Sequence, residues 1–171
     1  MIDIKEVLIR IKKNNDCFIY PPQGLPNVGS DHILPDDLRM FYQLCGGVSL
    51  FSSSAYSINI VSPNKFLLAN PVIFTGVSEE DLYASKGDIS WSWYLIGKGE
   101  NGQFITIDLA KDRLGRCYDS FWDCHAMPGS SQIIAKSFTE MLLRLVENQG
   151  KHWYWLQPHF TPYGDAYDED K

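Results

Sequence analysis

The chain has 171 residues, of which 44% are hydrophobic and 21% charged, and its formal net charge at pH 7 is −6. This length allows one ordinary domain to bury its core without disulfides or structural metals. No apolar run approaches the roughly 18 residues of a membrane helix, no basic cluster is present, and the four cysteines form no C-x-x-C pair. We therefore expect a cytoplasmic protein with reduced thiols, without membrane or direct nucleic-acid partners.

Two helices are predicted in the N-terminal third of the chain. The first lies near the N-terminus, where apolar residues recur at helical spacing (Ile4, Val7, Leu8 and Ile11). A proline-rich loop follows at 20–31, and the second helix is expected at 35–45. Pro35 suits its first turn, Asp36 and Asp37 favour a helix N-terminus, and Gly46-Gly47 suits its end.

From Val48 onward the apolar residues alternate with a period of two, which predicts strands. We expect strands at 56–60, 93–97, 104–109 and 116–121. Asn101-Gly102 suits a tight hairpin between the second and third of these strands, so the block should be an antiparallel meander.

A last helix is predicted over 133–147, with Ser137 and Thr139 as capping candidates. Its proposed apolar face comprises Ile134, Phe138, Met141, Leu142, Leu145 and Val146. Helices that flank an antiparallel sheet in a single domain define an α+β fold.

The composition changes after Gly150. We therefore expect a domain at 1–150 and a C-terminal extension at 151–171, which begins with aromatic residues and ends with acidic ones. The extension either covers the domain or contacts a partner.

Four short motifs occur in a fixed order between about residues 30 and 147. They are Leu34-Pro35-x-x-Leu38 with Phe41-Tyr42 and Gly46-Gly47, then Gly102-x-x-x-x-Ile107-Asp108-Leu109, then Gly115-x-x-x-Tyr118-Asp119, and finally Ala135-x-Ser137-Phe138-x-x-x-Leu142. Each motif alone is common, whereas all four in this order resemble the Smi1/Knr4 family, also called the SUKH superfamily. The C-terminal extension has no counterpart in the family pattern.

The resemblance implies an α+β domain without a catalytic site. Bacterial members serve mostly as immunity proteins, which bind and neutralise a cognate toxin, often a nuclease, of a polymorphic or contact-dependent toxin system. Fungal relatives act as regulatory scaffolds. The expected partner is therefore a toxin protein, and the acidic net charge of this chain suggests that the toxin surface is basic.

The sequence carries no recognisable catalytic or metal-binding motif. None of the four histidines (His32, His125, His152 and His159) stands beside a G-x-S-x-G elbow, an H-E-x-x-H pair or a phosphate loop. Cys117, Cys124 and His125 have suitable chemistry for zinc but the wrong spacing. We expect no metal, no cofactor and no enzymatic activity; the alternatives are a regulatory scaffold that binds a host protein and a small hydrolase.

Eight residues are candidates for partner binding. Trp91 and Trp93 bracket one residue, as do Trp153 and Trp155, so on a strand the rings of each pair would project from one face. These rings either cover the sheet and anchor the extension or serve as exposed interface anchors. The acidic residues Asp165, Asp168, Glu169 and Asp170 form either a solvated tail or an attractor for a basic toxin. Asp108 lies in an apolar strand, and we expect a structural or turn-capping role for it.

Overall fold

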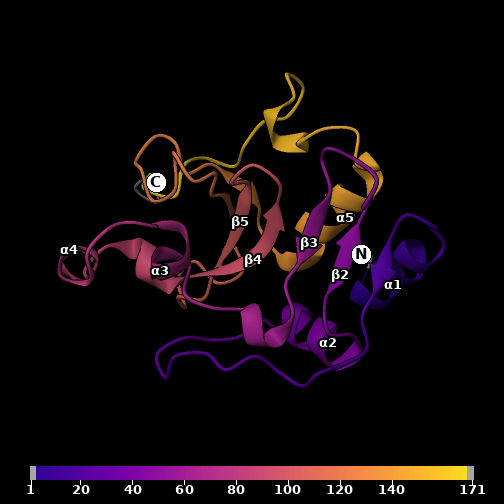
Figure 1. Cartoon of the computed structure of the whole chain (residues 1–171), viewed down its shortest axis with the longest axis horizontal. Coiled ribbons are helices and arrows are strands. Elements are labelled where there is room, and N and C mark those ends of the chain that lie inside the picture. The colour runs from indigo at the N-terminus through magenta and orange to yellow at the C-terminus, as the bar shows by residue number, and fades with distance from the viewer. Residues whose placement is uncertain (1–2, 169–171) are drawn as a thin grey trace.

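A computed structural model of the chain describes residues 3–168 (Figure 1). Seven strands form one antiparallel sheet, and their order in the sheet is their order in the chain. The strands are β1 (Phe18–Ile19), β2 (Val48–Leu50), β3 (Ile58–Ile60), β4 (Trp93–Gly99), β5 (Phe104–Asp108), β6 (Cys117–Asp119) and β7 (Ile133–Ala135). The helices are α1 (Ile4–Lys12), α2 (Asp36–Leu44), α3 (Ala69–Ile73), α4 (Glu79–Ala84) and α5 (Phe138–Asn148), with short 3-10 helices at Pro63–Lys65, Ile89–Ser92 and Tyr154–Leu156. The predicted α+β fold with an antiparallel meander is confirmed.

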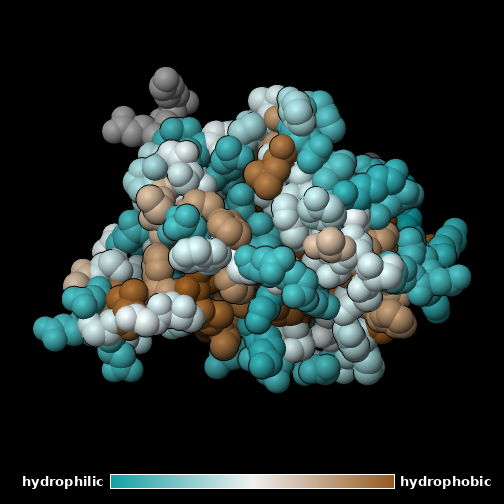
Figure 2. Space-filling model, turned by 45° about the horizontal axis from the view of Figure 1, so that its top comes forward, coloured by the Kyte–Doolittle hydropathy of each residue, from teal (hydrophilic) through white to brown (hydrophobic). Residues whose placement is uncertain are grey.

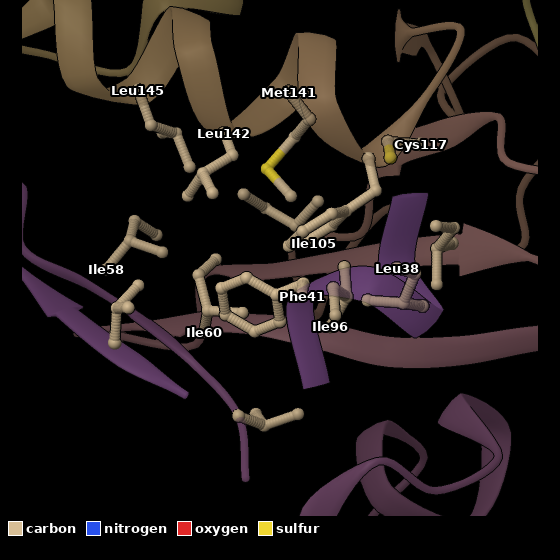
Figure 3. Close-up of a cluster of buried hydrophobic side chains, with 14 of the residues drawn as sticks. Leu38, Phe41, Ile58, Ile60, Ile96, Ile105, Cys117, Met141, Leu142 and Leu145 are labelled. Carbon is tan, nitrogen blue, oxygen red and sulfur yellow. The ribbon is translucent and has the colours of Figure 1, made fainter. Parts of the chain in front are cut away.

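The main core lies between the first face of the sheet and helices α1, α2 and α5. Figure 3 shows Met141, Leu142 and Leu145 of α5 pointing toward side chains of β3, β4 and β5. Phe41 of α2 enters the same cluster and meets the ring of Phe138 edge to face, with ring centroids 4.8 Å apart. These helices form because one stripe of each is apolar, and that stripe is the buried one.

The second face of the sheet is covered over only part of its width. A smaller cluster covers it on β4, β6 and β7, where α3 and the C-terminal extension pack against Trp93, Tyr118 and Ile133. Over the other half, the side chains of Phe18 in β1 and Asn59 in β3 are exposed, whereas Ser49 of β2 between them is buried. One half of this face is therefore available for contacts.

Several predicted boundaries need correction. The expected helix at 133–147 is wrong at its start, because Ile133–Ala135 is strand β7, paired with β6. Helix α5 begins at Phe138, after Ser137 has capped its first turn by accepting a hydrogen bond from the backbone N–H of Glu140. The predicted strand at 56–60 begins only at Ile58, and the one at 116–121 is limited to Cys117–Asp119.

The C-terminal extension covers one edge of the sheet. The backbone N–H of Ile133 donates to Gly164 O, and that of Tyr163 donates back to Ile133 O, at distances of 2.9 and 3.0 Å. Gln132 and Asp165 form an antiparallel bridge beside these bonds. The extension thus pairs with β7, which would otherwise be an open edge strand.

Among residues 3–168, no helix combines the length and apolarity that a membrane crossing needs.

Candidate interaction surfaces

A buried polar cluster centres on Asp108, at the end of β5. The carboxylate is fully buried and accepts five hydrogen bonds of 2.6–3.0 Å. The donors are Ser92 Oγ, Trp93 Nε1, Ala110 N, Arg113 Nε and Tyr118 OH. Arg113 also supplies the compensating charge. Both oxygens are engaged within the fold, so Asp108 of β5 joins β4 and β6 through hydrogen bonds. This is the structural role that the sequence predicts.

A second buried polar cluster surrounds His125. Its Nε2 lies 2.8 Å from Asn70 Oδ1 and its Nδ1 lies 3.0 Å from Ser120 Oγ. Since the Asn70 oxygen can only accept, a neutral ring with its proton on Nε2 fits this arrangement. Burial lowers the pKa of His125 to about 4, opposed in part by the charge of Asp88. The ring is therefore neutral near pH 7, and its two nitrogens serve the fold.

The predicted tryptophans Trp91 and Trp93 lie inside the molecule. Trp91 is in the 3-10 helix Ile89–Ser92, outside the sheet, where its ring stacks on Tyr83 with centroids 5.3 Å apart. Trp93 is fully buried, donates to Asp108 and packs on Tyr118. A ring in this position covers the sheet, and contact with a partner would require the fold to open.

Trp153 and Trp155 lie at the end of the sheet near the β4–β5 turn. The two rings stack with centroids 5.6 Å apart, and Tyr56 meets Trp153 edge to face at 5.2 Å. Trp155 is buried in the main core, whereas Trp153 is half-buried and lies against Gly99. These residues anchor the extension to the domain, and Trp153 and Tyr56 still contribute to the surface.

The acidic residues of the extension fall into two groups. Asp165 and Asp168 are engaged in a local turn: Asp165 Oδ1 accepts from the backbone N–H of Tyr167, and Asp168 Oδ2 accepts from that of Asp165. A groove of about 720 Å³ lies beside them, and its lining carries lysines and arginines as well as carboxylates, so its charges offset one another. Glu169 and Asp170 lie outside the described residues.

The most exposed tryptophan is one that sequence reasoning did not select. Trp122 follows β6 and is 56% exposed. Its backbone N–H donates to Gly102 O at 3.0 Å, so it is joined to the β4–β5 turn. Its only sequence signal is the position between Phe121 and Asp123, just after a predicted strand, and such a position does not distinguish an exposed ring from a buried one.

The open half of the second sheet face forms a groove of about 610 Å³. Tyr20 OH and Ser49 Oγ are 2.9 Å apart there, and Ser49 Oγ donates to Asn59 Oδ1. The charged residues that line the groove are Lys65 and Lys98. A groove of this charge fits a basic partner poorly.

Figure 2 shows mostly hydrophilic and intermediate residues on the face in view, with hydrophobic residues in small patches.

The cysteines and His125 do not assemble a metal site. Cys117 is buried in the main core, and His125 contacts Phe74 and Trp93 on the other side of the sheet. Within residues 3–168, no group of three or more His, Cys, Asp or Glu side chains has an arrangement that could hold a metal ion.

Comparison with known proteins adds two findings. The family described as the SMI1 / KNR4 family (SUKH-1) matches residues 31–144. The chain is also 43% identical, over 167 residues, to the protein named "Immunity protein YokJ" of Bacillus subtilis (strain 168). That alignment covers 98% of this chain and 97% of the relative, so it includes the C-terminal extension.

Proposed function

This chain belongs to the SMI1/KNR4 family (SUKH-1), and from that membership we propose that it is an immunity protein, which binds a cognate toxin and neutralises it. The observation that carries the proposal is the 43% identity to a protein named as an immunity protein, over 98% of this chain. Because the similarity extends along nearly the whole length of both chains, it supports the same role for the whole protein, where a shared short motif would not.

The proposed mechanism is stoichiometric binding without catalysis. Its support comes from the two buried polar clusters around Asp108 and His125, two side chains of types that can perform acid–base chemistry. All five donors to Asp108 and both partners of the His125 ring belong to the fold, and both residues are buried. Neutralisation then requires a surface complementary in shape and charge to the toxin.

The proposed toxin has a basic surface, and a nuclease of a polymorphic or contact-dependent toxin system is the class we favour. The net charge of −6 supports this choice, because an acidic protein attracts a basic partner over a distance of about one Debye length. The acidic residues of the extension would contribute to that attraction, and Trp153 would contact the toxin directly.

Co-expression tests the proposal. The first step is to search the neighbouring genes for a toxin-like protein. That protein is the probe, and it is produced in cells with and without the chain. We expect the chain to restore growth, and the purified pair to form a stable one-to-one complex by size-exclusion chromatography with light scattering. An unrelated acidic protein of similar size serves as the control. Continued toxicity together with no detectable complex would overturn the proposal, and binding to a host protein would then favour a regulatory scaffold.

A further inference from the structure

The β4–β5 turn presents one large aromatic ring that the fold does not cover. Trp122 is 56% exposed, whereas Trp91, Trp93 and Trp155 are buried. Tryptophan is enriched among the residues that dominate binding free energy at protein interfaces. The exposed indole of Trp122 is therefore of the residue type that most often anchors a protein interface.

The turn holds the indole of Trp122 in a fixed position. Gly102 has φ +78°, in the left-handed region, and a Cβ at this position would collide with Trp122 Cδ1. The indole thus lies directly on the turn backbone, where only glycine leaves room for it. The backbone hydrogen bond from Trp122 N to Gly102 O fixes the same contact. Because the turn backbone restricts the positions open to the ring, less conformational entropy is lost when a partner covers it.

Two carboxylates accompany the exposed ring. Glu100 lies in the turn and Asp123 directly follows Trp122, and both side chains are exposed. Among residues 3–168, neither carboxylate forms an ion pair or a side-chain hydrogen bond. Burial raises the pKa of the nearby Cys124 thiol to about 11, and the charges of Asp119 and Asp123 add to the rise.

We infer that the toxin docks on this turn, with Trp122 as the central anchor and Glu100 and Asp123 as its charged rim. The occupant is a basic segment of the toxin, whose Arg or Lys side chain stacks on the indole face while its neighbours pair with the carboxylates. Trp153 and Tyr56 add aromatic surface at the other end of the same turn, where Trp153 packs on Gly99. This inference rests on the proposed function and names the surface that performs it.

Binding measurements with the purified toxin test the assignment. Trp122→Ala should raise the Kd by at least about thirtyfold, mainly through faster dissociation. Tyr83→Ala is the matched control, since Tyr83 is 51% exposed on α4, away from the turn (Figure 1). Glu100→Gln combined with Asp123→Asn should slow association roughly three- to tenfold at low salt. Glu79→Gln combined with Glu80→Gln makes the same charge change on α4 and should have a much smaller effect.

The outcomes separate the two proposals. If Trp122→Ala lowers the melting temperature, the association rate of the Glu100→Gln and Asp123→Asn double variant tests the docking surface. Those two side chains are exposed and carry no hydrogen bond that the fold needs. If the native chain binds the toxin and both turn variants bind equally well, the docking surface is wrong and the immunity function stands. A larger loss of affinity or association rate in the α4 variants than in the turn variants would also overturn the assignment. If the native chain neither binds nor neutralises the toxin, the proposed function fails, and this inference fails with it.

Discussion

Two side chains with catalytic chemistry, Asp108 and His125, are structural residues here. The Asp108 carboxylate is buried, and a buried charge is tolerated only when it is paired and its lone pairs are satisfied. Arg113 supplies the charge, and hydrogen bonds from strands β4 and β6, the 3-10 helix Ile89–Ser92 and the loop after β5 complete the site. The same carboxylate therefore fixes the second face of the sheet, including the orientation of Trp93.

Replacing Asp108 tests this role. Asp108→Asn removes the charge that balances Arg113 and turns one acceptor oxygen into a donor facing other donors. We expect a loss of about 3–5 kcal/mol in the free energy of unfolding, since one partner of a buried pair is left alone. Asp112→Asn is the control, because Asp112 also pairs with Arg113 but its side chain is 66% exposed. Urea denaturation of both variants provides the comparison, and equal losses would contradict the structural role.

His125 predicts a dependence of stability on pH. Its pKa is about 4 in the folded protein and about 6.5 in the unfolded chain, so the unfolded chain binds the proton more tightly. The stabilisation of the folded state by a neutral His125 is fully present above pH 6.5 and is lost as the pH falls toward 4. This difference corresponds to about 3 kcal/mol.

A variant that cannot titrate isolates this effect. The stability of the native chain should fall more steeply between pH 6.5 and 4 than that of His125→Gln, measured by thermal melts or urea curves. Groups such as Asp119 and Glu140 also have shifted pKa values, but they are present in both proteins and cancel in the difference. Parallel pH profiles would show that the ring is not buried in its neutral form.

At the scale of elements, Asp37 joins the N-termini of two helices. It lies in the first turn of α2, and its Oδ2 accepts hydrogen bonds from Thr139 N and Thr139 Oγ1 of α5, at 2.8 and 3.0 Å. A carboxylate near two helix N-termini is favoured by both helix dipoles. Its contacts span 102 positions in the sequence, so no local pattern could have predicted them.

Asp37→Ala should therefore cost about 1–2 kcal/mol of stability, the magnitude of a lost helix cap. Asp36→Ala is the matched control: it removes the same charge from the same turn of α2, but Asp36 is exposed and has no bond to α5. Chemical denaturation would contradict this prediction if both variants lost equal stability.

The C-terminal extension acts as an eighth, irregular strand. Its backbone bonds to Ile133 and Ser131 close the β7 edge, and Ala166 is buried in the second core with the half-buried Tyr167 packed beside it. Deleting residues 162–171 should lower stability by about 2–4 kcal/mol, since about three backbone hydrogen bonds and part of an aromatic ring are lost. It should also promote self-association through the exposed edge. Deleting only residues 169–171 is the control, and equal melting temperatures for the two truncations would exclude this role.

For the whole molecule, the excess of negative charge should act on the rate of association with the toxin. Neutralising Asp165, Asp168, Glu169 and Asp170 together as Asn or Gln should slow association several-fold at low salt and leave dissociation nearly unchanged. The difference should shrink as salt shortens the Debye length from about 10 Å at 0.1 M. Stopped-flow or surface-based kinetics over a salt series measure this. Unchanged association rates would exclude the extension as the source of attraction.

The sequence by itself determined the elements whose signals are local. The apolar stripe of α1 follows from residue spacing, α2 follows from its end signals, and the Asn101-Gly102 turn follows from its residue types. Helix periodicity, helix ends and turn conformation depend on residues within a few positions of one another. The four family motifs likewise pointed to the family that the comparisons support. Local physics and residue order were sufficient for these features.

Only the tertiary structure decided the rest. Ile134 fits the spacing of the α5 face, yet it lies in β7, because pairing with β6 depends on residues that the local pattern does not contain. Trp91, Trp93 and Trp155 are buried, whereas Trp153 is half-buried. Trp93 is held inside by a hydrogen bond to Asp108, which lies 15 residues away in the sequence. Trp122 stays at the surface because Gly102 brings the turn backbone beneath its ring. Side-chain burial is a property of packing between distant segments, and for that reason the surface offered to a partner could not be derived from the sequence.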